Sequence, residues 1–190
     1  MNWQDLHRFW FGDISLTPEY YERQIGRWFM QTYPKFDWVC EHQFAPWLHE
    51  LKSMPENLFP RDYLALILLF DQIPRNTFRN DKRAVRYDQL AQKLTLKALG
   101  TELETSLTLP ERMFLYLPLE HSENLKLQEL SVEKFFELHK EAPKDLQSWT
   151  WDCLDYALEH QKMIKQFGRF TYRDSWADTS SSGAGVLLSI

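Results

Sequence analysis

The longest apolar run in the chain is Tyr63-Leu64-Ala65-Leu66-Ile67-Leu68-Leu69-Phe70. The run could be a buried strand, but leucine and alanine dominate it and Ile67 is its one β-branched residue, a composition that favours a helix. Because a helix that is apolar on every side must be surrounded by other elements, the run predicts a central helix, buried all round. It is far shorter than the ~20 apolar residues that a membrane span requires.

The flanking sequence carries helix start and stop signals and lacks strand signals. On the N-terminal side these signals predict helices over residues 3–11, closed by Gly12, over 18–30, capped by Thr17, and over 37–51, kinked or broken at Pro46. On the C-terminal side they predict one helix over residues 81–99, closed by Gly100, and another that begins at the capping box 108–111. Two more are predicted over residues 131–142 and 146–167, the last closed by Gly168. We therefore expect an all-α protein of about eight helices packed as helical hairpins.

Composition indicates one folded domain with no general attraction to polyanions. The chain has 190 residues, of which 44% are apolar and 15% aromatic. This is enough for the core of a single all-helical domain, which we place at residues 1–174. A Ser/Gly-rich stretch follows, and we expect residues 175–190 to form a flexible C-terminal tail. The net charge of −5 gives no general attraction to nucleic acid or to anionic membranes, so neither is an expected partner.

Several kinds of site lack their sequence signatures. Cys40 and Cys153 are far apart and belong to no CxxC pair, so neither a disulfide framework nor a structural zinc site is expected. Glycine-rich phosphate loops and an HExxH motif are absent, and we expect no metal and no cofactor. The N-terminus has no basic start followed by an apolar core, which indicates a cytoplasmic protein of bacterial type rather than a secreted one.

The densest polar stretch, residues 71–79, directly follows the central apolar run. Asp71 is then expected at the C-terminal end of a helix, where the helix dipole disfavours a carboxylate unless a cation lies beside it. Arg75 and Arg79 are near in sequence, and Asn76 lies between them. The cluster is either a structural ion-pair network or an edge whose guanidinium groups bind a carboxylate or phosphate.

A second polar group follows a proline. Pro118 is expected to interrupt a helix and to free backbone groups beside His121 and Glu123. A histidine beside a carboxylate could exchange protons near neutral pH, which makes His121 and Glu123 candidates for general acid–base catalysis. The alternative is that the two side chains only satisfy the freed backbone groups.

The third polar group lies near the C-terminus. His160 is on an apolar helix stripe, at steps of three and four residues from Ala157 and Ile164. Such a histidine is either a buried core residue or a further candidate for proton transfer. Arg169 and Arg173 flank a turn with aromatic residues between them. The two arginines could clamp an anion, or they could pair with an acidic residue of the other groups.

Together these groups resemble a bacterial family catalogued as domain of unknown function 924. The matching motifs are Phe9-Trp10-Phe11-Gly12, the DQ-PRN-FR block over residues 71–79, the YLP-x-x-HSE block over 116–123, Gln128, and the A-x-x-H…FGRF block over 157–170. The resemblance covers residues 3–174. It implies an all-helical fold similar to tetratricopeptide-like hairpins, and no particular activity. The shared polar positions are Asp71, Arg75, Asn76, Arg79, His121, Glu123, His160, Arg169 and Arg173.

The chain departs from the family pattern near its end. The family usually reads RFGRFPHRN, whereas this chain has Gln166, Thr171, Tyr172 and Asp174 in place of the first arginine, the proline, the histidine and the asparagine. A Ser/Gly-rich tail also replaces a further turn and a short acidic helix. A family site that used that histidine and asparagine would lack part of its machinery here.

Three functions are consistent with these patterns. The first is a site for a small anionic ligand, and so a candidate enzyme, in which the four arginines bind the anion and His121 or His160 exchanges a proton. The second is a tetratricopeptide-like module for a protein or peptide partner, with exposed anchors among aromatic residues that could equally be core: Trp28, Trp38, Trp47 and Trp149. The third is a buried polar network that holds the helices in register.

Overall fold

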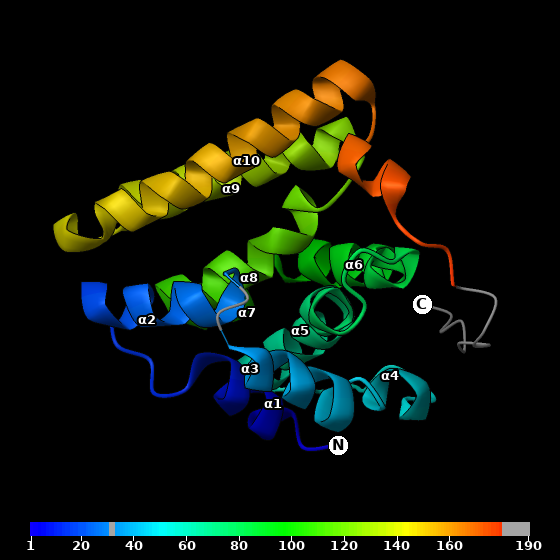
Figure 1. The fold of residues 1–190 in the computed structure, drawn as a ribbon. Coiled ribbons are helices and arrows are strands. Elements are labelled where there is room, and N and C mark those ends of the chain that lie inside the picture. Colours follow the sequence, from blue (N-terminus) through cyan, green and yellow to red (C-terminus); the bar gives the residue numbers. More distant parts are fainter. Residues whose placement is uncertain (31–32, 180–190) are drawn as a thin grey trace.

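The computed structural model describes residues 1–30 and 33–179, and it is built almost entirely of helices (Figure 1). No β-sheet forms within these residues, whose isolated bridge joins Asp81 to Ala177. The predicted all-α class is therefore confirmed. None of the helices in this part of the chain combines the length and the apolar character needed to cross a bilayer.

The α-helices are α1 (Trp3–Phe11), α2 (Pro18–Trp28), α3 (Pro34–Val39), α4 (Trp47–Glu50), α5 (Pro60–Thr77), α6 (Asp88–Ala98), α7 (Glu102–Ser106), α8 (Leu109–Glu120), α9 (Leu125–Glu141) and α10 (Gln147–Phe167). A π-helical turn spans Cys40–Phe44, and 3₁₀ turns span Lys82–Val85, Lys144–Leu146 and Thr171–Ser175. The short helix α7 has no predicted counterpart.

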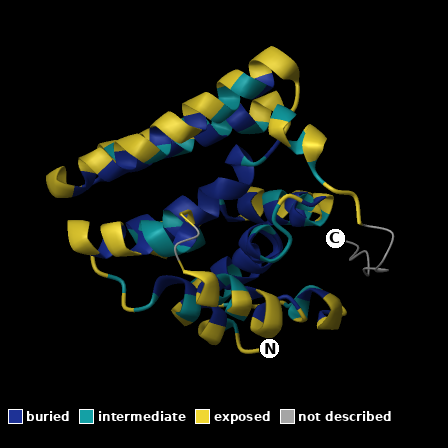
Figure 2. Ribbon diagram, viewed as in Figure 1, coloured by how far each residue is buried: buried dark blue, intermediate teal, exposed yellow. Residues whose placement is uncertain are grey.

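Helix α5 is the centre of the molecule. Helices α9 and α10 form a long antiparallel hairpin on one side of it, and α8 lies between this hairpin and α5 (Figure 1). Helices α1, α3 and α4 pack on the opposite side of α5. Residues 64–73 of α5 are buried without exception (Figure 2), so the apolar run does form the predicted central helix.

Helix ends with a clear chemical signal lie where the sequence predicts them. Gly12 closes α1 with a φ of 62°, and Gly168 closes α10 in the left-handed conformation with a φ of 71°, a region where a side chain would be strained. At the start of α8, the Thr108 backbone N–H donates to Glu111 at 2.8 Å, and the Thr108 hydroxyl donates to the same carboxylate at 2.6 Å. The predicted capping box is thus present.

Two expected helix ends are wrong, that of the central helix before Asp71 and that of the next long helix at Pro118, and in both cases the helix continues through a proline. The central helix does not end at Phe70 but continues through Pro74 to Thr77, so Asp71 lies well inside α5. Similarly, Pro118 does not interrupt α8, which runs on to Glu120. A proline removes one hydrogen bond and crowds the preceding turn, but at both positions the prolyl residue itself is buried in the core-facing part of its helix. Tertiary packing therefore outweighs the local cost.

Other boundaries shift for local reasons. The predicted helix over 37–51 begins earlier, at Pro34, and is divided into α3, the π-helical turn and α4, which agrees with a break at Pro46. Helix α9 begins at Leu125, six residues before the predicted start at 131. Its N-cap is Asn124, whose side chain accepts a hydrogen bond from the Lys126 N–H at 2.9 Å, a capping role typical of asparagine.

The segment after Arg173 differs from the predicted tail in its first residues. Ala177 donates its N–H to the Asn80 carbonyl at 3.0 Å and accepts one from the Lys82 N–H at 2.9 Å. Asp178 also lies 3.1 Å from the Lys82 ammonium. Residues 175–179 therefore follow the body of the protein, and the rest of the expected tail, residues 180–190, lies outside the described part of the chain.

Candidate functional site

A buried carboxylate in the last turns of α5 organises the polar residues of this region. Asp71 is 1% exposed, and it accepts hydrogen bonds from the Gln72 amide at 2.7 Å and from Nδ1 of His121 at 2.8 Å. Arg75 lies one helical turn further on, with Nη1 3.1 Å from Oδ1 of Asp71. Burial alone would raise the pKa of Asp71, but the charge of Arg75 and the contact with His121 lower it to about 2. Asp71 is therefore a fixed negative charge.

Arg75 connects this carboxylate to α6. Its guanidinium group donates to both carboxylate oxygens of Asp88, at 2.7 and 2.8 Å, and to the Asp71 backbone carbonyl at 2.7 Å. A two-pronged pair of this kind fixes the orientation of the guanidinium plane. Asp71, Arg75 and Asp88 thus form a buried ion-pair network between α5 and α6.

His121 caps the C-terminus of α8 and faces Asp71. Because a carboxylate can only accept, Nδ1 of His121 must carry the hydrogen of the 2.8 Å bond. Nε2 is then the nitrogen with a lone pair, and it has no hydrogen-bond partner among the described residues. Burial and the charge of Arg75 lower the pKa of His121, against the opposing effect of Asp71. The ring is accordingly a neutral base that a carboxylate holds in one tautomer.

Glu120, the neighbour of His121, is a site residue that the sequence patterns missed. It is 5% exposed, and its carboxylate accepts no hydrogen bond from the described residues. Burial, with the charge of Asp71 added, raises the pKa of Glu120 to about 8, although Arg75 opposes this. The group therefore carries a proton at neutral pH. The available signal was a lone acidic residue at the end of an otherwise apolar stretch, residues 113–119.

His160 approaches Glu120 from α10. Its Nδ1 lies 3.5 Å from Oε1 of Glu120 and donates to the Tyr156 carbonyl at 2.8 Å. The ring packs edge-on against Phe170, with centroids 5.2 Å apart. Burial is the main reason why the pKa of His160 is lowered. His160 is therefore neither a fully buried core residue nor a free one, since its Nε2 remains available to a ligand.

The turn at Thr171–Ser175 places Arg173 over the same region. Arg173 donates to the His121 carbonyl at 3.2 Å and lies 3.4 Å from the carboxylate of Glu123. Glu123 also accepts the Phe170 N–H at 3.0 Å. Glu123 thus holds the C-terminal turn in place, and neither it nor the His121 side chain binds backbone groups freed by Pro118.

The remaining predicted site residues divide into two groups. Arg79 donates to both carboxylate oxygens of Asp37, at 3.0 and 2.8 Å, and to the Asn76 side-chain oxygen at 2.8 Å. Asn76 therefore positions Arg79. Arg169, in contrast, forms an exposed pair with Asp174 at 2.7 Å, and it does not line the pocket that the other arginines share.

These side chains surround a pocket of about 250 Å³. Its lining consists of Arg75, Arg79, Asn80, Ala84, His121, His160, Tyr172, Arg173 and Trp176. The structure thus brings five of the predicted residues to one pocket, from α5, α8, α10 and the C-terminal turn. No group of three or more His, Cys, Asp or Glu side chains is placed to hold a metal ion within residues 1–30 and 33–179.

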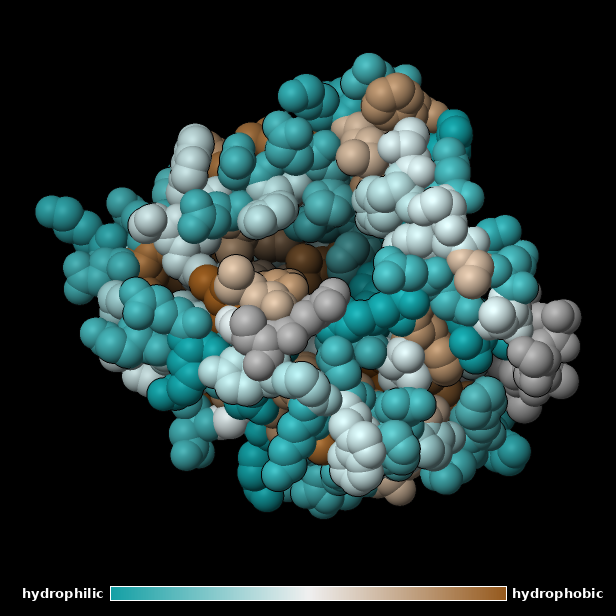
Figure 3. Space-filling view, viewed as in Figure 1, coloured by the Kyte–Doolittle hydropathy of each residue, from teal (hydrophilic) through white to brown (hydrophobic). Residues whose placement is uncertain are grey.

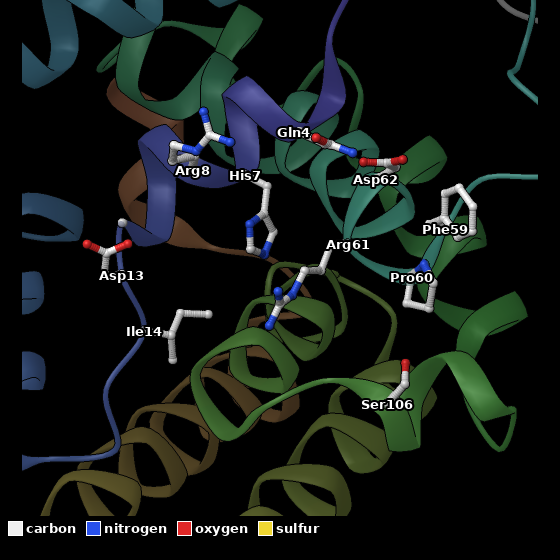
Figure 4. A pocket seen from close by; sticks show the side chains of 11 residues that line it. Gln4, His7, Arg8, Asp13, Ile14, Phe59, Pro60, Arg61, Asp62 and Ser106 are labelled. Carbon is white, nitrogen blue, oxygen red and sulfur yellow. The ribbon is translucent and has the colours of Figure 1, made fainter.

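A larger hollow, of about 770 Å³, lies at the start of α1 and α5 (Figure 4). His7 and Arg61 point toward each other in it, and both bind the buried carboxylate of Glu111, at 2.7 and 2.8 Å. Glu111 is also the capping residue of α8. Because His7 and Arg61 are both held by Glu111, which joins α1, α5 and α8, we regard this hollow as a structural junction.

Comparisons with known proteins agree with the sequence motifs. The model of a family described as bacterial protein of unknown function (DUF924) matches residues 6–183. The chain belongs to this family. A solved structure of a protein of unknown function from Agrobacterium tumefaciens is similar in fold, with a TM-score of 0.56 and 22% identity, over 90% of this chain and 87% of that one. A comparison with curated proteins gives no match.

One of the four positions at which this DUF924 chain differs from the motif quoted above lies in the pocket wall. Tyr172, which stands where the motif has histidine, lines the pocket, and its ring lies 5.8 Å from that of Trp176. Asp174, which replaces the asparagine, points instead to Arg169. Tyr172 is therefore part of the pocket wall in this chain, and the Asp71–His121 pair does not involve it.

Proposed function

We propose that the pocket binds a small molecule with one carboxylate group and that His121 acts on this ligand as a general base. The observation that carries the proposal is the 2.8 Å contact of Asp71 with Nδ1 of His121, which leaves Nε2 for the ligand. A buried carboxylate that holds a histidine in this tautomer is a recurrent arrangement in general-base catalysis. Glu120, protonated at neutral pH, can supply the complementary acid.

Charge decides what kind of anion fits. The three arginines of the pocket face four carboxylates, those of Asp37, Asp71, Asp88 and Glu123. These charges leave one carboxylate in excess, so the pocket offers N–H donors rather than a net positive charge, and we expect a doubly charged phosphate to be disfavoured. A single carboxylate needs only two well-placed N–H donors.

Unused donors are present in two of the arginines. Nη1 of Arg79 has no hydrogen-bond partner among the described residues, because Nε and Nη2 bind Asp37 and Asn76. Nε of Arg173 is buried and also lacks a partner in the described part of the chain. Nη1 of Arg79 belongs to a side chain that is 30% exposed, so it can donate to a ligand. Nε of Arg173 is the buried donor, and because an unpaired buried donor is costly, an acceptor that reached it would be stabilised.

The test is thermal unfolding in the presence of small carboxylates, phosphate and sulfate, with Arg173→Ala and Arg169→Ala in parallel. A carboxylate at ~100 times its dissociation constant should add about 2.7 kcal/mol to the free energy of unfolding of the wild type. Arg173→Ala should abolish the shift, whereas Arg169→Ala should keep it because Arg169 lies outside the pocket. The proposal is wrong if no carboxylate stabilises the wild type, or if both variants respond alike.

The alternative of a peptide-binding module has weaker support. Of the four tryptophans considered as anchors, Trp28 and Trp149 are buried and Trp47 is half-buried. Trp38 is 57% exposed, but its ring is stacked on that of His42 at 4.5 Å. Only one of these four tryptophans is exposed, so they give a peptide no row of anchors, and we favour the small-molecule site.

A further inference from the structure

Another hollow, of about 830 Å³, lies between α2, α8 and α10 and adjoins the arginine-lined pocket. Its walls are largely apolar and include Ile25, Phe29, Met30, Met113, Leu117, Phe135, Trp149 and Tyr156. Figure 3 shows a hollow with a hydrophobic floor between the layer of α10 and that of α2. We call this hollow the apolar groove.

The apolar groove and the pocket share two residues. His121 and His160 line both. Glu120 lines the groove at this junction, where it is buried and its carboxyl group lies 3.5 Å from Nδ1 of His160. A carboxyl group that has only one long polar contact in an apolar wall costs free energy, so a ligand in the groove that hydrogen-bonds to Glu120 would lower that cost.

The charges around the two hollows give a bound molecule a direction. Asp152 and Asp155 are exposed residues of the groove lining, which disfavours an anionic group at that end. Arg75, Arg79 and Arg173 lie on the other side of the histidines. A molecule that spans both hollows would therefore direct its anionic end to the arginines and its uncharged end into the groove.

We propose that the apolar groove and the pocket form one site for an amphipathic carboxylic acid, whose carboxylate lies among the arginines and whose hydrocarbon body lies along α2, α8 and α10. This inference rests on the proposed function and names its ligand class. Phe29, Met30 and Tyr156 support it, because they are large apolar residues with 48%, 65% and 67% exposure at the groove. Grouped exposed apolar side chains of this kind mark binding surfaces.

The experiment is calorimetric titration with straight-chain carboxylates from two to eight carbons, and with octanamide as the uncharged analogue. Each methylene buried in the groove should tighten binding roughly fourfold. Phe29→Ala should flatten this dependence on chain length and leave acetate binding unchanged. Phe136→Ala is the matched control, because Phe136 is also half-exposed, at 51%, but lies on α9 outside the groove.

The outcomes separate this inference from the proposed function. If carboxylates bind with the same affinity at every length, the groove is not part of the site and the proposed function stands. If octanamide binds as tightly as octanoate, and Arg173→Ala changes neither, the groove is an independent apolar site and the joined site is refuted. If no member of the series binds, both proposals fail.

Discussion

At the scale of single residues, the site holds two acids whose environments separate their pKa values in opposite directions. Asp71 has Arg75 and His121 as partners and stays ionised, with a pKa of about 2. Burial, with the charge of Asp71 added, raises the pKa of Glu120 to about 8, because the opposing charge of Arg75 and the 3.5 Å contact with His160 do not offset it. Such a separation is how one site assigns a charged and a protonated role to similar groups. A purely structural network of buried polar groups would require the ionised Asp71 but not the protonated Glu120.

Asp71→Asn tests how much of the fold depends on that charge. The change leaves Arg75 with Asp88 alone and removes the carboxylate that holds His121. Removal of one partner of a buried pair costs about 3–5 kcal/mol, and we expect a loss of this order in urea unfolding. Asp174→Asn is the control, because its exposed pair with Arg169 should matter little. An Asp71→Asn protein as stable as the wild type would rule out a structural role for the network.

The sequence could predict which residues meet only where the chain itself brings them close. Asp71 and Arg75 are one turn apart, so their pairing follows from helical spacing. The meeting of His121, His160 and Arg173 depends on how α8, α10 and the last turn pack, and the motifs alone suggested it. Arg169 illustrates the limit, because the glycine turn directs it to Asp174 and away from the pocket.

At the scale of elements, helix ends were predictable where a side chain or a glycine marks them. Gly12, Thr108 and Gly168 are such marks, and the helices end or begin there. The C-terminal end of α5 was not predictable from local signals, because the helix continues through the buried Pro74. Caps and prolines act on the local backbone, whereas packing against the neighbouring helices decides how far α5 extends.

Glu111 shows one side chain joining three such elements. Its carboxylate caps α8 and binds His7 of α1 and Arg61 of α5. Glu111→Gln should lower the free energy of unfolding by about 2–3 kcal/mol, because charged hydrogen bonds are lost inside the protein. Glu141→Gln is the matched change at an exposed carboxylate, that of the pair with Arg112, and should cost less than about 1 kcal/mol. Equal losses in chemical unfolding would show that Glu111 has no special role as a junction.

For the whole molecule, the buried groups predict a stability maximum near pH 6.5. The pKa values of His121 and His160 are lowered by burial, so their contribution to stability is complete above the unfolded value of ~6.5 and is lost as the pH falls through their folded values. The pKa of Glu120 is raised to about 8. Its contribution is therefore complete below its unfolded value of ~4.3 and declines as the pH rises to about 8.

Glu120→Gln separates the loss of stability at acid pH from the loss at alkaline pH, since glutamine has nearly the same shape as glutamate and does not ionise. In the wild type, the free energy of unfolding should decline above pH 6.5 by at most about 1.4 kcal/mol per pH unit, the limit for one proton. The variant should lack this decline and keep the loss on the acid side, which belongs to the histidines. Urea unfolding from pH 5 to 9 measures both. A decline above pH 6.5 that persists unchanged in Glu120→Gln would mean that Glu120 is ionised in the folded protein, and the acid assigned to the site would have to be another group.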